Sequence, residues 1–181
     1  TIQEGDSLCF NTDNLAVLQA FIDSSLATFP DSLDISMLSD SVASIDELKP
    51  LELGGVQYWK NGQLIYFVAS SRGLSGGIPE SIDNLGRLQS LNISNNYLSG
   101  ELPSSIYTLL ELDYLNLSGN QLTGQINPFF CTQINNWEME GTSSNNSYLY
   151  NNNFCPPYPV CDGVQITSEE YQNIIECTPG E

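Results

Sequence analysis

A 24-residue repeat is the feature that most constrains how this chain can fold. Apolar residues and glycines return at equivalent positions in three successive units, namely Phe67, Leu91 and Leu115, then Leu74, Leu98 and Leu122, then Gly76, Gly100 and Gly124. A fixed period of about 20 to 50 residues is the signature of a solenoid, in which each unit buries its apolar face against its neighbours. We therefore expect an α/β solenoid with three stacked coils over residues 61–130 and a parallel sheet along the stack.

The repeat resembles the plant-type leucine-rich repeat. Its pattern, LxxLxxLxLxxNxLxGxIP, is matched almost completely over residues 85–106, while Arg72 and Asn127 stand where the motif has Asn and Pro. The resemblance implies a short repeat stack in one continuous domain. A helical N-terminal cap (residues 1–60) and a disulfide-linked C-terminal cap (residues 131–181) would then cover its two ends.

Residues 1–60 carry the pattern expected of the N-terminal cap. Thr12 is the predicted helix N-cap, and the apolar residues that follow it have helical spacing. The serine- and aspartate-rich run 31–48 predicts a second, weaker helix or turn, and its acids lack the spacing of a calcium-binding loop. A hairpin is predicted around Asn61 and Gly62. Such a Trp-containing hairpin resembles the cap of this family, but Trp59 has no cysteine pair beside it, and Cys9 has no evident mate.

The period breaks after Phe130. The segment 148–154 resembles half of a further repeat, with Asn152 in the place of Asn120 and an insertion or loop at 141–147. Four cysteines in the last third indicate two disulfides, and of the three possible pairings we predict Cys131–Cys155 and Cys161–Cys177. A capping-box pattern at residues 167–170 predicts a helix that closes the end of the core.

Composition limits the function. Twenty-two acidic residues against four basic ones give a net charge of −18. This charge argues against nucleic acid or anionic membrane as a partner and favours a solubilising surface over a calcium site or a basic partner. The chain has no histidine and no paired cysteines of the CxxC type, so we expect no metal, no cofactor and no catalytic residue. No apolar run is long enough for membrane insertion, and we expect any signal peptide to have been removed already.

The alternation of strand side chains predicts a binding surface. Two columns of outward residues are the candidate ligand-binding set, namely Tyr66, Ser90 and Tyr114, then Val68, Asn92 and Asn116. Ser70, Ser94 and Ser118 are expected to form a further exposed column. This neutral surface, rich in hydroxyls and amides, suits carbohydrate or peptide, although the family pattern alone also accounts for these residues.

Three sequons, at Asn92, Asn116 and Asn145, are typical of a glycosylated secreted protein. We expect sugar on at least one of Asn92 and Asn116, where it would cover the predicted binding surface.

The sequence therefore predicts a secreted, non-enzymatic recognition module that binds protein or polysaccharide at the cell surface. The alternative is a self-assembling subunit of an extracellular filament or cell coat, in which Cys9 would form an intermolecular bond. A third function, inhibition of a cell-wall enzyme, rests on family analogy alone.

Overall fold

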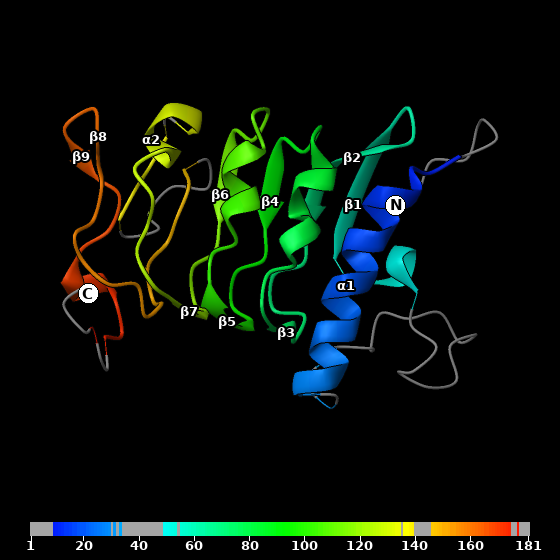
Figure 1. Cartoon of the computed structure of the whole chain (residues 1–181), viewed down its shortest axis with the longest axis horizontal. Coiled ribbons are helices and arrows are strands. Elements are labelled where there is room, and N and C mark those ends of the chain that lie inside the picture. The colour runs from blue at the N-terminus through cyan, green and yellow to red at the C-terminus, as the bar shows by residue number, and fades with distance from the viewer. Residues whose placement is uncertain are drawn as a thin grey trace.

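The coils of the chain stack side by side in one row. The computed structural model describes residues 9–29, 31, 33, 49–53, 55–134, 136–139, 146–174 and 177. Helix α1 (Thr12–Thr28) lies at one end of the row and the C-terminal segment at the other (Figure 1). A four-stranded sheet in the order β1-β2-β4-β6 contains β1 (Val56–Lys60), β2 (Gln63–Val68), β4 (Ser90–Asn92) and β6 (Tyr114–Asn116). A second sheet, in the order β3-β5-β7, contains β3 (Ser75–Gly76), β5 (Tyr97–Glu101) and β7 (Gln121–Thr123).

Residues 24 positions apart in the sequence pair with each other in the four-stranded sheet. Phe67 pairs with Leu91, and Leu91 pairs with Leu115, in parallel strands as predicted. All three side chains are fully buried, as are Leu98 and Leu122 on the next turn of each coil. Burying an apolar side chain of this size contributes about 1.5–3 kcal/mol. One continuous core therefore forms, and it runs from α1 through the coils into the C-terminal segment.

A ladder of buried asparagines joins successive coils. The Asn120 side-chain oxygen accepts from the Leu98 N–H at 3.1 Å, and its amide nitrogen donates to the carbonyls of Ile93 (3.0 Å) and Leu117 (2.9 Å). Asn152 makes the same contacts one coil further on, with the Leu122 N–H and the Leu117 carbonyl. The segment 148–154 is therefore half of a fourth coil, as its sequence predicted.

The N-terminal helix forms as predicted, except for its cap. Asn11 and not Thr12 is the N-cap, because the Asn11 side chain reaches the N–H groups of Asp13 and Asn14, each at 2.9 Å. The helix buries Leu18, Phe21 and Ile22, among others, against the first coil. Except for residues 31 and 33, the weaker helix or turn predicted at 31–48 lies outside the described residues. The predicted hairpin turn is confirmed, with φ of 52° at Asn61 and 76° at Gly62.

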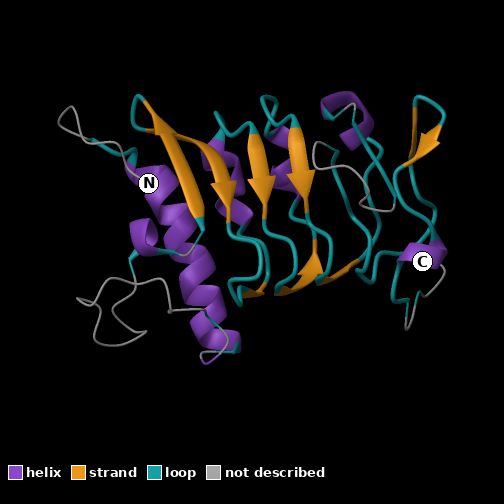
Figure 2. Cartoon of the chain, turned by 180° about the vertical axis from the view of Figure 1, so that it is seen from behind, coloured by secondary structure: helices purple, strands orange, loops and turns teal. Residues whose placement is uncertain are grey.

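Helices cover one face of the four-stranded sheet. The 3₁₀ helices η3 (Pro50–Glu52) and η4 (Glu80–Leu85) both pack against α1. A third, η5 (Ser104–Thr108), packs against η4. In Figure 2, which views the molecule from behind, strands β2, β4 and β6 lie in front of η4 and η5. The opposite face of the strands is therefore free of any described helix.

The disulfides join Cys131 to Cys161 and Cys155 to Cys177, so the predicted pairing is wrong. The pairing follows from the end of the coils at which each cysteine lies. Helix α2 (Phe130–Gln133), which holds Cys131, lies at the same end of the coils as β8 (Val160–Cys161) and β9 (Val164–Gln165), at the top of Figure 1. Cys155 lies at the opposite end, where its N–H donates to the Gly124 carbonyl at 2.8 Å.

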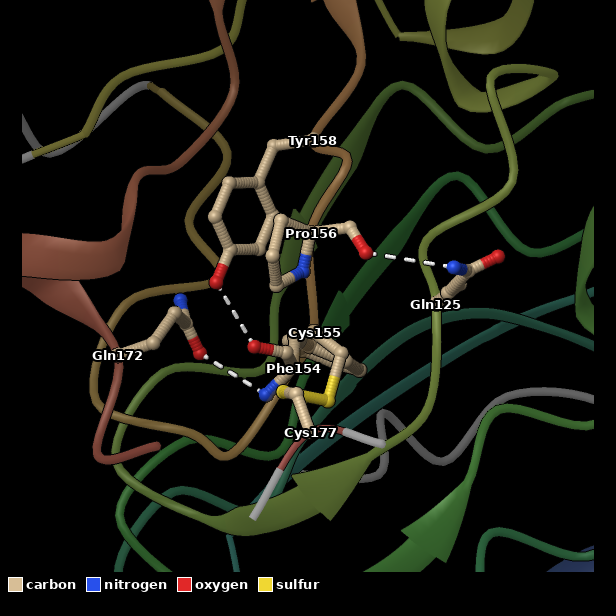
Figure 3. The surroundings of a disulfide bond; sticks show 7 residues. All are labelled: Gln125, Phe154, Cys155, Pro156, Tyr158, Gln172 and Cys177. Atoms are coloured by element: carbon tan, nitrogen blue, oxygen red, sulfur yellow. Dashed lines mark hydrogen bonds between the residues drawn. A yellow bond between two sulfur atoms is a disulfide. The ribbon is translucent and has the colours of Figure 1, made fainter. Parts of the chain in front are cut away.

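The closing helix predicted to begin at residues 167–170 is also wrong, since over the described residues 167–174 only the single 3₁₀ turn η6 (Glu169–Tyr171) forms. Gln172 is buried instead and continues the asparagine ladder. Its Nε2 donates to the Leu149 carbonyl at 3.0 Å and to the Thr167 hydroxyl at 2.7 Å, and its Oε1 accepts from the Phe154 N–H at 3.3 Å (Figure 3). The Thr167 hydroxyl therefore accepts from the Gln172 side chain, whereas in a capping box it would accept from a backbone N–H.

Candidate recognition face

The six predicted binding residues lie together on one sheet face. Tyr66 pairs with Ser90, and Ser90 with Tyr114. In the next column Val68 pairs with Asn92, and Asn92 with Asn116. Neighbouring strands in a sheet are about 4.8 Å apart, so the six side chains form one continuous surface. We call these six residues the open face, because the helices lie on the other side of the sheet (Figure 2).

The open face carries no charge. Tyr66 is exposed, and the other five residues are half-buried. Phenol, hydroxyl and amide groups provide hydrogen-bond donors and acceptors, and the tyrosine rings add flat apolar area. The surface can therefore bind a neutral partner without placing an unpaired charge in the interface.

The serine column predicted beside the open face is wrong. Ser94 is 3% exposed and Ser118 is 1% exposed. Each hydroxyl donates to the side-chain oxygen of the asparagine two residues earlier, at 2.7 Å for Asn92 and 2.6 Å for Asn116. Ser94 also lies 3.0 Å from the Ser70 hydroxyl. These bonds orient the Asn92 and Asn116 side chains. Because the serines are buried, the open face extends no further than the column of these two asparagines.

The sequon asparagines Asn92 and Asn116 are half-buried at the edge of the open face, and their oxygens are engaged by the serines. The Asn116 amide nitrogen makes one long bond, 3.4 Å, to the Tyr114 hydroxyl. Asn145 lies outside the described residues. Both amide nitrogens on the sheet, the atoms that would carry a glycan, thus lack a strong bond within the described part of the chain.

The sequence interpretation missed Tyr58 as part of this surface. Tyr58 pairs with Tyr66 across the β1-β2 hairpin, and their rings stack with centroids 5.3 Å apart. Both rings are exposed, Tyr58 to 48% and Tyr66 to 42%. The turn at Asn61 and Gly62 alone would pair Tyr58 with Ile65, and the β-bulge between Tyr58 and Trp59, which the sequence does not signal, shifts Tyr58 to Tyr66. A cavity of about 230 Å³ opens beside this aromatic pair.

Among the described residues, no three His, Cys, Asp or Glu side chains are grouped so that they would hold a metal ion. Nor does the described part of the chain contain a helix with the length and hydropathy needed to cross a membrane.

Comparison with known proteins identifies the repeats. The family model of the Leucine Rich Repeat matches residues 87–109 and 111–133. No curated protein shows significant similarity to the chain.

Among solved structures, the ectodomain of the receptor kinase SOBIR1 from Arabidopsis thaliana matches with 21% identity and a TM-score of 0.51, covering 82% of this chain and 84% of that one. The PEPR1-AtPEP1 structure matches with 20% identity and a TM-score of 0.52, covering 82% of this chain and 20% of that one. A further match is the ectodomain of GASSHO1/SCHENGEN3 from Arabidopsis thaliana, in complex with CASPARIAN STRIP INTEGRITY FACTOR 2, at 30% identity and a TM-score of 0.41. It covers 49% of this chain, which spans only 10% of that ectodomain. Residues 87–109 and 111–133 therefore carry leucine-rich repeats, and the chain shares the fold of the SOBIR1 ectodomain and of PEPR1, which supports the resemblance to plant-type leucine-rich repeat proteins.

Proposed function

We propose that the chain is an extracellular, non-enzymatic recognition module that holds a protein partner along the open face. The observation that carries this proposal is a continuous uncharged surface, two columns wide, on a sheet whose other face is covered by helices. Stacked coils fix the spacing of these side chains, so little conformational freedom is lost on binding. The two disulfides support an oxidising, extracellular setting.

Polysaccharide is the second class of partner that this surface suits. The exposed rings of Tyr58 and Tyr66 offer flat area for a sugar, and Asn92 and Asn116 offer amide groups close to it. Both classes of partner would contact Tyr66, Asn92 and Asn116.

Site-specific photo-crosslinking tests the protein partner. A crosslinking amino acid at Ser90, in the centre of the open face, should capture a partner from the extracellular fluid of the producing organism. The same amino acid at Glu80, which lies on η4, should not. Tyr114→Ala should reduce capture from Ser90, whereas Phe129→Ala, which removes an exposed aromatic ring outside the sheet, should leave it unchanged. Equal capture from Ser90 and Glu80 would contradict the proposal.

We further propose that at least one of Asn92 and Asn116, at the edge of the open face, carries sugar, and that Asn145 does so in addition. The amide nitrogens of the two half-buried sheet asparagines, which make no strong bond within the described part of the chain, support this modification at the first two sites. Intact-mass measurement of the secreted chain before and after deglycosylation reports the occupancy. A glycan on the sheet would move partner contact towards Tyr58 and Tyr66, at the hairpin end.

Self-assembly is the alternative function, and the exposed free thiol of Cys9 favours it. A disulfide between two Cys9 residues would give a dimer that reductant dissociates. Native size, measured with and without reductant and compared with Cys9→Ser, separates this alternative from a monomeric recognition module.

A further inference from the structure

The cavity of about 230 Å³ at the hairpin end of the open face has a lining suited to a particular ligand. It lies between the tip of the β1-β2 hairpin and the residues that enter β4. Its walls combine two tyrosines, two basic side chains and three carboxamides, namely Tyr58, Tyr66, Lys60, Arg87, Asn61, Gln63 and Gln89. The sequence alone did not predict this site.

The charge of the cavity is opposite to that of the chain. Only four of the 181 residues are basic, and two of these, Lys60 and Arg87, line this one cavity. Twenty-two acidic residues give the whole chain a net charge of −18. An anionic group is therefore attracted here and repelled over most of the remaining surface.

Both basic side chains can bind a ligand. Lys60 is exposed and makes no ion pair within the described part of the chain. Arg87 pairs through Nη1 with Glu111 of the next coil. A guanidinium has five N–H donors, so this pair orients Arg87 and leaves other donors for a second carboxylate. The Glu111 carboxylate would compete with a bound anion for the Arg87 guanidinium.

The remaining walls match a sugar ring better than an acidic peptide side chain. The stacked Tyr58 and Tyr66 rings present flat apolar area, which suits the face of a pyranose. The carboxamides of Asn61, Gln63 and Gln89 offer both donors and acceptors around it, as ring hydroxyls require. A glutamate side chain is narrow and would use only the basic groups.

We propose that this cavity binds the carboxylate-bearing ring of a uronic-acid saccharide. The carboxylate lies between Lys60 and Arg87, the ring faces the tyrosines, and the hydroxyls bond to the carboxamides. The proposal deepens the proposed recognition function, because the neighbouring sugar units extend from the cavity along the open face.

Isothermal titration of the full chain with trigalacturonic acid, and with its methyl ester, tests the proposal. The ester keeps the rings and loses the charge, so the acid should bind and the ester should bind at least about fivefold more weakly. Lys60→Met and Arg87→Gln should each weaken binding of the acid about fivefold, the effect of one partly exposed ion pair. Lys49→Met removes the same charge outside the cavity and should leave the affinity unchanged. Glu111→Gln should strengthen binding, since it removes the competing carboxylate.

Equal affinity for acid and ester, or an unchanged affinity in both Lys60→Met and Arg87→Gln, would overturn the proposal. So would equally tight binding of triglutamate, which would assign the cavity to acidic peptides. The recognition function has a separate readout, because crosslinking from Ser90 and its loss in Tyr114→Ala use residues that do not line the cavity. Normal capture from Ser90 without uronate binding would refute the saccharide and leave the recognition function in place.

Discussion

At the scale of single residues, one buried asparagine in each coil holds the backbone of its neighbours. Asn120 bonds to the backbone of Leu98, Ile93 and Leu117 from a position that is 6% exposed. Alanine there would leave a buried N–H and buried carbonyls without partners. Since such a loss costs about 1–3 kcal/mol, Asn120→Ala should lower the free energy of unfolding by about 2–3 kcal/mol.

Urea denaturation measures this effect. Gln121→Ala, at the exposed next position in β7, is the matched control and should change the free energy of unfolding by no more than about 0.5 kcal/mol. If the two variants have the same midpoint, the ladder does not stabilise the fold.

The sequence predicted the repeat register because a 24-residue period can be read directly along the chain. It misplaced Ser94 for a physical reason. Alternation of side chains holds only within a strand, and β4 ends at Asn92. Ser94 lies two residues beyond, in the turn, where bonding to Asn92 and Ser70 takes it inward. Its exposure therefore depended on the length of β4, which the pattern does not specify.

At the scale of elements, local signals predicted the N-terminal part well and the C-terminal part poorly. A helix with apolar spacing and a hairpin turn are both encoded by neighbouring residues, as α1 and β1-β2 confirm. Disulfide pairing depends instead on which end of a coil each cysteine reaches, and Cys131 and Cys155 reach opposite ends. The predicted terminal helix does not form, because the buried Gln172 side chain bonds to Leu149 and Phe154 of the last coil instead.

Tyr158 connects the C-terminal segment to the last coil and gives it a pH dependence. Its hydroxyl donates to the Phe154 carbonyl at 2.8 Å (Figure 3). Burial, and secondarily the charge of Glu169, raise the pKa of Tyr158 above the ordinary value of 10.0. The folded state thus retains this proton more firmly than the unfolded state, so the contribution of Tyr158 is complete below pH 10 and is lost as the pH rises through the folded pKa.

Urea denaturation across the alkaline range should therefore show the free energy of unfolding falling above about pH 10. Tyr158→Phe should lose about 1 kcal/mol at neutral pH, because the hydrogen bond is gone, and should fall less steeply at alkaline pH. Glu169→Gln should reduce the slope by a smaller amount. Identical slopes in Tyr158→Phe and the parent chain would show that another group titrates.

At the scale of the whole molecule, the open face was predictable and the cavity beside it was not. Strand alternation and the repeat register place Tyr66, Ser90 and Tyr114 in one column. The cavity instead needs Lys60 from the hairpin beside Arg87 from the next coil, and no repeat relates these two positions. Only the packing of the hairpin against the first coils brings them together.

The net charge of −18 acts on the molecule as a whole and should make its stability depend on salt. Like charges crowded on a compact fold repel one another, and the repulsion lessens in the expanded unfolded chain. Salt shortens the Debye length to about 10 Å at 0.1 M and screens this repulsion. Raising sodium chloride from about 10 to about 300 mM should therefore raise Tm by about 2–4 °C, which corresponds to about 1 kcal/mol for a chain of this size.

The same titration should weaken trigalacturonic acid binding, because salt also screens the attraction between its carboxylates and the basic cavity. Stability and uronate affinity would then respond to salt in opposite directions in one molecule. Potassium chloride should reproduce both effects, since screening depends on ionic strength, while sucrose should leave the affinity unchanged. A Tm that stays constant or falls over this range would show that the acidic residues are too far apart to repel one another. Lys60 and Arg87 alone would then direct anions to the cavity, since the acidic residues would not repel anions from the rest of the surface.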